Sequence, residues 1–395
     1  MGIARGLAVL SIGVLPALAT AACGSSSSSD SGQSDSAIKI AVITSLSGDS
    51  AAGLGEPTKD AVEAFEKAHP TVDGKKLEFK FMDDQSDPTK ASALANTVAT
   101  DKSYLAVIGP SASAMLFAAA PVLLQGGVPT MGVSPATEDQ LNNKYYFAPN
   151  SYSLKDYVTG GVPLFKSMSI QPSQYAYVIE NGATAAANDP ILKAAGIPKF
   201  VVDAGLADYS TAMAKLKSDG YKGLWVNNSE RGGYARKAEV DMGWDAPFVT
   251  PPNTFNEAFL RQAGDSANGV IAMTQVSMVD PSNAADADVK AEAEKFQAAV
   301  KQESGETAFQ LGIASSIAWD QSLSLYDAVD GMLQGKQDIS RDSLVKTLQT
   351  QTFAGAGGRV TRKPGGNDFQ SGFAEGSPVY AKWTDGQLEI VKLGS

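Results

Sequence analysis

Residues 104–137 (YLAVIGPSASAMLFAAAPVLLQGGVPTMGVSPAT) hold two successive turns from a predicted strand into a predicted helix, and this repeat most constrains the fold. In the first turn, the apolar run 105–108 ends at a Gly-Pro pair that precedes the helical stretch 114–124. In the second, the run 128–133 ends at a Ser-Pro pair. A repeated strand, turn and helix predicts a parallel α/β sheet. In such a sheet these turns meet at the carboxyl edge, where crevices form and ligands bind.

Both turns carry small hydroxyl residues, namely Ser111, Ser113, Ser134 and Thr137. At a helix start, backbone N–H groups lack partners inside the helix, and together with the helix dipole they favour an anion. Two such turns facing one crevice would hold a carboxylate without a cationic side chain. The alternative is that these residues only cap their helices.

The pattern of alternating strands and helices extends along most of the chain. Strands are expected at 38–46 and 77–82, and a second strand and helix cycle begins near residue 154 with no Pro-rich or Gly-Ser linker before it. Two lobes joined by a hinge would account for this, and the long helices expected at 288–302 and 314–333 would return to them. The predicted fold class is therefore α/β, with two Rossmann-like doubly wound lobes. The expected divisions are residues 38–150 plus 277–356 for lobe 1 and 151–276 plus 357–395 for lobe 2.

The N-terminus has the features of an export signal. A short positive start that includes Arg5 precedes a short apolar segment, and small residues lead into Cys23, the single cysteine. Residues 1–23 are similar to a bacterial lipoprotein signal, which implies that Cys23 is the lipidated first residue of the mature protein. Residues 24–37 are Ser-rich and would form a polar tether.

Composition excludes several function classes. The formal net charge is −11, which argues against nucleic acid as a partner. A single histidine, His69, lies in a polar loop, so no Ser-His-Asp or Cys-His arrangement can form. No phosphate-binding or dinucleotide-binding motif is complete. We therefore expect neither an enzyme nor a protein that depends on a metal or a cofactor.

The motifs DDQSDP, AVIGPSASA and GVSPAT, in this order and spacing, give the chain a family resemblance. It resembles the substrate-binding proteins of ABC importers in the branched-chain amino acid (Leu, Ile, Val) class, which have the type I periplasmic-binding-protein fold. The resemblance implies that lobe 1 holds a ligand carboxylate. The residues it assigns to lobe 1 are Ser111 or Ser113, then Thr137 with Ser134 or Ala136, and Ser47 and Leu54 beside the ligand side chain.

The second lobe departs from that family pattern. Asn181 begins the turn in which the family has a Tyr-Gly pair, and residues 227–230, with Ser229 and Glu230, replace its tyrosine. The acid that would pair with a ligand ammonium falls in residues 250–256, which include Asn253 but no acid. Because a buried ammonium without a carboxylate is costly, either Glu230 or Glu180 takes that role or the ligand has no free α-amino group. The sequence slightly favours the second alternative, in which Glu230 is a first-turn helix acid that the helix dipole favours.

The expected function is that of an extracytoplasmic, lipid-anchored receptor. It would capture a small amino-acid-like, carboxylate or amide solute by closure of two lobes. Its partners would be that ligand, the membrane through a lipid anchor, and an ABC permease with its ATPase. The rival hypothesis is a lipoprotein of the same fold that senses a ligand and signals through a partner without transport.

Overall fold

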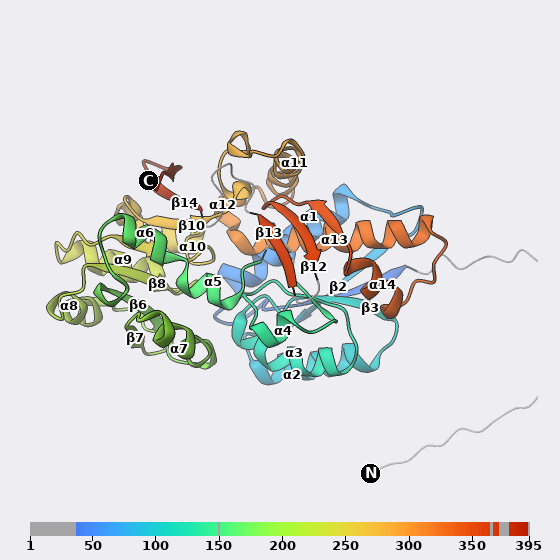
Figure 1. Ribbon diagram of the computed structural model, residues 1–395, viewed down its shortest axis with the longest axis horizontal. Helices are drawn as coiled ribbons and strands as arrows, with labels where there is room; N and C mark the ends of the chain where they lie inside the picture. The colour runs from blue at the N-terminus through green and yellow to red at the C-terminus, as the bar shows by residue number, and fades with distance from the viewer. Residues whose placement is uncertain (1–36, 149–150, 364–365, 371–378, 394–395) are drawn as a thin grey trace, which may run out of the picture. The chain divides into compact units, whose positions relative to one another are not determined.

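The computed structural model describes residues 37–148, 151–363, 366–370 and 379–393 (Figure 1). Cys23 and the predicted tether lie outside the described residues. Within those ranges, none of the helices combines the length and the apolar character that crossing a membrane requires.

The first sheet is entirely parallel. Its strand order is β2-β1-β3-β4-β5. The bounds are β1 Ile38–Thr44, β2 Leu77–Asp83, β3 Tyr104–Ile108, β4 Thr130–Met131 and β5 Tyr146–Phe147. Strand β1 is buried almost throughout, as expected for a central parallel strand that is covered on both faces.

The second sheet repeats the same order with later strands. Its order is β15-β14-β10-β9-β8-β6-β7, and all pairs from β10 to β7 are parallel, whereas β14 and β15 add an antiparallel edge. The bounds are β6 Tyr175–Glu180, β7 Lys199–Val202, β8 Gly223–Asn227, β9 Phe248–Thr250, β10 Ile271–Thr274, β14 Val379–Thr384 and β15 Gln387–Val391. Two parallel sheets of the same winding confirm the predicted fold class.

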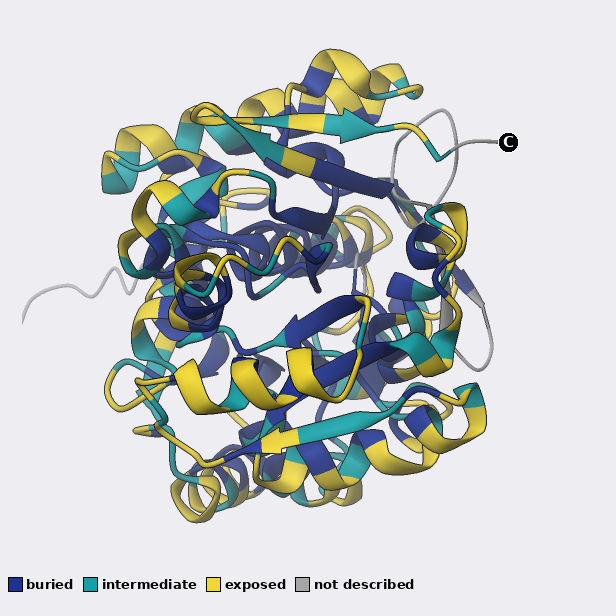
Figure 2. Cartoon of the chain, turned by 90° about the vertical axis from the view of Figure 1, so that its left-hand side faces the viewer, coloured by how far each residue is buried: buried dark blue, intermediate teal, exposed yellow. Residues whose placement is uncertain are grey.

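Helices cover the faces of both sheets, so that the strands appear as buried ribbons between partly exposed helices (Figure 2). In the first half of the chain the helices are α1 Glu56–Ala68, α2 Pro88–Thr100, α3 Ser113–Gln125 and α4 Glu138–Leu141. The second sheet has α5 Leu154–Thr159, α6 Gly161–Ser167, α7 Ala183–Ala195, α8 Ser210–Ser218, α9 Gly232–Asp241 and α10 Glu257–Ala263. The later helices are α11 Ala287–Ser304, α12 Ala308–Leu311, α13 Ile313–Gln334 and α14 Arg341–Leu348.

The C-terminal third returns to both lobes, as expected. Phe296 of α11, Trp319 of α13 and Leu344 of α14 are fully buried in the same core as β1 and β3. Strand β14 instead pairs with β10 of the second sheet. The chain therefore passes from one sheet to the other after β5, returns after β10, and passes again before β14. Several crossings of this kind are the covalent basis of a hinge.

Two local features differ from the sequence-based expectation. A three-stranded antiparallel sheet of β11 Thr352–Ala354, β12 Arg359–Lys363 and β13 Gly366–Gln370 was not predicted. In sequence, residues 154–168 read as a single helix, but they form two helices, α5 and α6, separated at Gly160. Pro163 explains the break, because it has no N–H to donate to the carbonyl of Thr159.

The Asp-Pro pair at residues 87 and 88 predicts the start of a helix, and the structure confirms it. Asp87 caps α2, and its carboxylate accepts a hydrogen bond from the Thr89 amide at 2.7 Å. Pro88 follows at the first helical position, where a missing N–H costs nothing. The cap explains this aspartate without a bound cation.

Candidate functional site

The carboxyl ends of both parallel sheets border one cavity of about 220 Å³. The loops after β1, β3, β6, β8 and β9 all contribute to it, as the doubly wound topology requires. Polar side chains dominate the wall: Asp49, Ser50, Ser113, Tyr157, Glu180, Asn181, Thr184, Asn227, Asn228, Ser229, Glu230 and Asn253. A cavity of this composition suits a small solute with several hydrogen-bonding groups.

Two helices begin at this cavity without a side-chain cap. Helix α3 has Ala112 at its N-cap and α7 has Gly182, and neither makes a capping hydrogen bond through a side chain. Residues 112–115 and 181–184 line the cavity from the two lobes. The first-turn N–H groups of both helices, together with the helix dipoles, therefore favour an anion there. Ser113, one of the predicted residues, stands at the start of α3 and lines the cavity.

A second, smaller cavity of about 20 Å³ adjoins the first, and the two share Leu54, Pro135, Tyr157 and Asn253. Its remaining wall is mostly apolar and includes Val133, Tyr152, Pro252, Ile313, Ala314 and Ile317. A space of this size holds about one water molecule or one methyl group. The two cavities together offer a polar compartment with a short apolar extension.

Ser111 and Ser134 lie at this smaller cavity, where internal hydrogen bonds hold them. The Thr44 hydroxyl donates to Ser111 Oγ at 2.8 Å, and Ser134 Oγ donates to the Ser111 carbonyl at 2.7 Å. Both serines are buried. The Ser134 hydroxyl has a single proton and donates it to the Ser111 carbonyl. Towards a ligand it can therefore act only as a hydrogen-bond acceptor.

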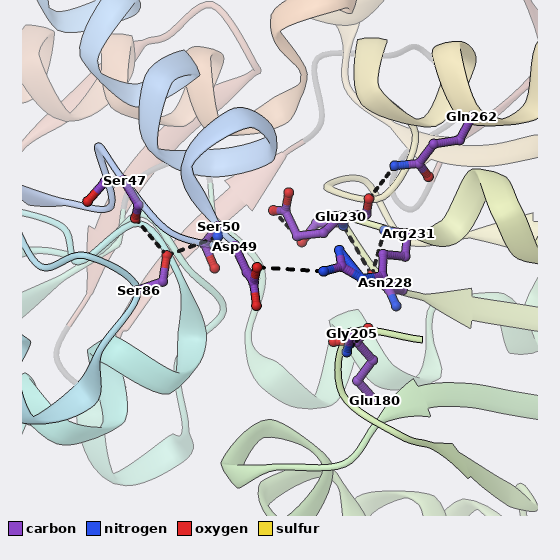
Figure 3. A network of polar contacts seen from close by, with 11 residues as sticks. Ser47, Asp49, Ser50, Ser86, Glu180, Gly205, Asn228, Glu230, Arg231 and Gln262 are labelled. Atoms are coloured by element: carbon purple, nitrogen blue, oxygen red, sulfur yellow. Dashed lines mark hydrogen bonds and ion pairs between the residues drawn. The ribbon is translucent and has the colours of Figure 1, made fainter. Parts of the chain in front are cut away.

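Three of the predicted residues line neither cavity. Ser47 Oγ donates to Asp83 at 2.7 Å, and the Ser47 carbonyl accepts a bond from Ser86 (Figure 3). Ala136 is fully buried in a small apolar cluster. Thr137 caps α4 and accepts a bond from the Gln140 amide at 3.4 Å. For Thr137, capping is the role that the described contacts supply.

On the second lobe, Asn181, Ser229, Glu230 and Asn253 all line the larger cavity. Among the residues that the structure describes, the Glu230 carboxylate has one weak hydrogen-bond partner, the Ser229 hydroxyl at 3.4 Å. Burial raises the pKa of the Glu230 carboxyl to about 7, and the Ser229 hydrogen bond only partly opposes this. Gly53 of the first lobe closes over it, since a Cβ at that glycine would lie 2.7 Å from Glu230 Oε1. A partly buried acid with so few partners can pair with a cationic ligand group.

Further acids surround Glu230 (Figure 3). Glu180 lines the same cavity and accepts a hydrogen bond from the Gly205 amide at 3.3 Å. Asp49 reaches across from the first lobe and forms an ion pair with Arg231, with 3.6 Å between Oδ1 and Nη2. The cavity wall carries these three carboxylates but, among the described residues, no Lys or Arg side chain. The electrostatic character of the wall beside these carboxylates therefore favours a cationic ligand group.

Tyr157 of α5 also lines both cavities, although sequence reasoning did not single it out. Its hydroxyl contacts the side-chain oxygens of Asn253 and Asn227, and the Asn227 amide donates to Tyr177 at 2.8 Å. Burial raises the pKa of Tyr157 well above its ordinary value, so the hydroxyl keeps its proton. In sequence, Tyr157 looks like an ordinary apolar-face residue of a helix. Only the approach of α5 to the loops after β8 and β9 gives it a place at the site.

A cavity at the carboxyl edges of two matching parallel sheets, in one chain that crosses repeatedly between them, defines a two-lobed solute-binding protein. Comparison with protein families agrees: a family model described as periplasmic binding protein matches residues 37–374. The chain belongs to this family, and its fold is the type I periplasmic-binding-protein fold.

Solved structures share this fold at low sequence identity. A leucine-binding protein, LivK, of Thermotoga maritima is 17% identical with a TM-score of 0.74, and the match covers 90% of this chain and 98% of that one. The branched-chain amino acid transporter substrate-binding protein LivJ of Streptococcus pneumoniae, in complex with isoleucine, is 19% identical over 90% and 99% of the chains, with a TM-score of 0.72. An ABC transporter solute-binding protein of Rhodopseudomonas palustris, in complex with benzoate, is 15% identical over 91% and 96%, with a TM-score of 0.74. A search of curated proteins finds no match.

Proposed function

We propose that this protein is the lipid-anchored binding component of an ABC importer and that it captures a small zwitterionic, amino-acid-like solute. One observation carries the ligand assignment. The uncapped start of α3, with Ser113, and the carboxylate of Glu230 line the same cavity from different lobes. A ligand with a carboxylate at one end and an ammonium at the other matches that pair of opposite preferences.

For the ligand carboxylate, the proposal rests on the first-turn amides of α3. Ser113 adds a hydroxyl at the same point, and α7 directs a second set of amides from the other lobe. Amides aimed at an anion in a confined cavity bind it without the desolvation cost of a buried lysine. Because a solute-binding protein of the same fold from Rhodopseudomonas palustris binds benzoate, a carboxylate without an amino group, the test below includes such ligands.

For the ligand ammonium, Glu230 is the proposed partner and Glu180 contributes charge from the neighbouring strand end. The sequence alone slightly favoured a ligand without an amino group, because the family acid is missing at residues 250–256. Two acids in one cavity supply the carboxylate from other positions. The internal partners of Glu230 are few, so an incoming ammonium would replace lost hydration rather than compete with an existing ion pair.

Capture by closure follows from the hinge. Residues from both lobes must surround the ligand at once, and the closed form gains the ligand contacts of both. Micromolar affinity requires about −8 kcal/mol, which an anion site, one ion pair and a short apolar extension can supply. Lipidation of Cys23 and delivery to a permease with its ATPase complete the proposed function.

The test compares ligands that differ only in the amino group. Protein from Gly24 onward is refolded from denaturant to remove carried-over ligand. Its melting temperature is then measured with leucine and with isocaproate, which is leucine without its amino group, and with benzoate. At 100 times its dissociation constant a ligand stabilises the fold by about 2.7 kcal/mol, a shift of a few degrees.

We expect leucine-like amino acids to raise the melting temperature and isocaproate not to. A shift with isocaproate or benzoate alone would replace the zwitterion by a simple carboxylate. The variant Glu230→Gln tests whether the ligand amino group binds at Glu230, because it should reduce the shift in melting temperature that leucine causes. No shift with any member of a broad panel of small metabolites would contradict solute capture itself.

A further inference from the structure

A basic pocket lies at the edge of the first lobe where its strands begin. Its volume is about 240 Å³, and it lies at the starts of β1, β3 and α14. The ligand cavity lies where β1 and β3 end, so the two are at opposite edges of one sheet. The wall of this basic pocket is formed by Ala37, Ile38, Lys39, Lys75, Lys102, Ser103, Leu105, Ile339, Ser340 and Arg341.

The wall carries four cationic side chains and, within the described part of the chain, no acid. This is unusual in a protein of net charge −11. Arg341 is held rigidly, since its guanidinium donates to the carbonyls of Val98 at 2.8 Å and Tyr104 at 3.0 Å. Lys102 donates to the Ala99 carbonyl at 3.0 Å. These carbonyls carry no net charge, and the acid that interacts electrostatically with Arg341 is Asp101.

Lys39 and Lys75 form no ion pair with any described residue. Two surrounding acids, Asp101 and Glu78, interact electrostatically with Lys39. Glu78 is already engaged by Lys80, with 2.6 Å between Oε1 and Nζ. Four cationic side chains beside these two acids leave an excess of positive charge next to open space, which together suit a phosphate group.

The pocket is also where the described chain starts. Ala37 and Ile38 belong to its wall, and only residues 24–36 separate it from Cys23. Thirteen residues span at most about 45 Å even when fully extended. If Cys23 is lipidated, as the proposed function holds, this edge of the first lobe is the part of the described structure covalently closest to the lipid.

We propose that the basic pocket is a docking surface for the anionic headgroups of the membrane that anchors the protein. A phosphodiester headgroup matches the pocket in charge, and the negative remainder of the protein is repelled by the same surface. Each lysine near an anionic bilayer contributes roughly a fivefold gain in the bound-to-free ratio. Docking by this edge leaves the ligand cavity, at the other edge of the sheet, open to solution.

The experiment uses Cys23, the only cysteine, as a chemical anchor. Protein from Cys23 onward is coupled through that thiol to a maleimide phospholipid in vesicles of phosphatidylcholine alone or with phosphatidylglycerol. An amine-acetylating reagent and mass spectrometry then report the reactivity of each lysine. We expect Lys39, Lys75 and Lys102 to be protected severalfold only on the anionic vesicles. Lys215 and Lys237, both more than half exposed on the second lobe, should not change.

Matched variants distinguish an effect of the basic pocket from an effect of the protein's net charge. Lys39→Gln with Lys75→Gln should abolish the protection of Lys102, whereas Lys215→Gln with Lys237→Gln should preserve it. Protection should also disappear in high salt, because a Debye length of about 3 Å at 1 M screens the headgroups. Loss of protection in both double variants would mean that net charge, not the pocket, governs the contact, and would overturn the proposal.

Two further results would also overturn it. Equal lysine reactivity on neutral and anionic vesicles would show that the headgroups are not recognised. Protection by inorganic phosphate on neutral vesicles, as strong as that by phosphatidylglycerol, would make the pocket a site for a small soluble anion instead. The coupling depends neither on natural lipidation nor on the ligand cavity, so these outcomes are independent of whether solute capture is correct.

Discussion

Asp49 in the loop after β1 and Arg231 before α9 form an ion pair that joins the two lobes, with 3.6 Å between Oδ1 and Nη2 (Figure 3). The Asp49 side chain is 81% exposed and that of Arg231 24%. The same loops bring Gly53 against Glu230. Contacts between these two loops therefore depend directly on how far the lobes are closed.

We expect Asp49→Asn to weaken ligand binding modestly, by no more than about fivefold, because exposed ion pairs contribute little. Titration calorimetry at low and high salt measures the effect. The wild type should lose affinity as salt rises, and the variant should lose less. Asp208→Asn, an exposed second-lobe aspartate outside the cavity, is the control. A tenfold or larger loss in Asp49→Asn would mean that Asp49 contacts the ligand itself.

Glu230 and Glu180 should differ in their contribution to an ammonium-bearing ligand. Burial raises the pKa of Glu230 and Gly53 of the first lobe packs against its carboxylate, so Glu230→Gln should reduce affinity for the amino acid by 10-fold to 100-fold, about 1.4 to 2.8 kcal/mol. Glu180→Gln should have a smaller effect. Dissociation constants from calorimetry check both, with Glu257→Gln on α10 as a surface control. A larger loss in Glu180→Gln than in Glu230→Gln would reverse the assignment.

Ligand affinity should depend on pH through Glu230. Burial raises the pKa of this carboxyl to about 7 in the ligand-free protein, whereas its ordinary value is 4.5. An ammonium group binds the ionised form, so a proton must leave and affinity should rise between pH 5.5 and 7.5, by up to about tenfold per pH unit. Calorimetry in buffers of different ionisation enthalpy counts the released proton. Glu230→Gln should make affinity constant over this range.

The Glu230 carboxyl should also make the stability of the ligand-free protein fall as pH rises, whereas ligand affinity rises. Its pKa is higher in the folded than in the unfolded state, so the folded protein binds more protons between pH 4.5 and 7. The free energy of unfolding of the ligand-free protein should therefore gain a term that falls as pH rises through this window. Urea unfolding of the wild type and Glu230→Gln across pH 4.5 to 7.5 measures the difference. If the free energies of unfolding of wild type and Glu230→Gln differed by the same amount at every pH in that range, the raised pKa would be contradicted.

Two glycines provide opposite tests of local packing, one in the segment after β1 and one inside α13. A Cβ at Gly55 would lie 1.6 Å from the Ser45 carbonyl oxygen, so Gly55→Ala must displace backbone and should destabilise the protein by several kcal/mol. At Gly331, inside α13, a Cβ meets nothing within 4 Å. Gly331→Ala should stabilise by about 0.5–1 kcal/mol, since alanine favours a helix interior. Urea unfolding curves of the two variants check both signs.

Local sequence patterns were sufficient to predict the doubly wound sheets. β-Branched runs such as Ile38–Thr44 and Tyr104–Ile108 become buried parallel strands, and small residues follow them at the turns. Because the carboxyl ends of parallel strands share one edge, Ser113 and Glu230 could be predicted to lie near a ligand without any contact being known. The roles of these residues in binding stay predictions.

The three-stranded sheet of β11, β12 and β13 was missed because its pattern is weak. Strand β11 has only three residues, and the glycine-rich segment between β11 and β12 reads as a loop. The sheet forms because Phe353 and Val360 are buried in the same core as Trp319 of α13. A strand of that length is stabilised by what it packs against, not by its own propensity.

The sequence by itself determined the alternating elements, the winding of both sheets and the turns at which a ligand could bind, because these follow from periodicity over a few residues. Only the tertiary structure decided which side chains at those turns face the cavity. Ser47 donates a hydrogen bond to Asp83, 36 residues away, and does not line the ligand cavity, whereas Asp49, two positions later, lines it. Tyr157 enters the site from a helix that the sequence marks only as amphipathic. The direction of a side chain in a loop depends on partners from distant parts of the chain, and these come together only when the sheets have formed.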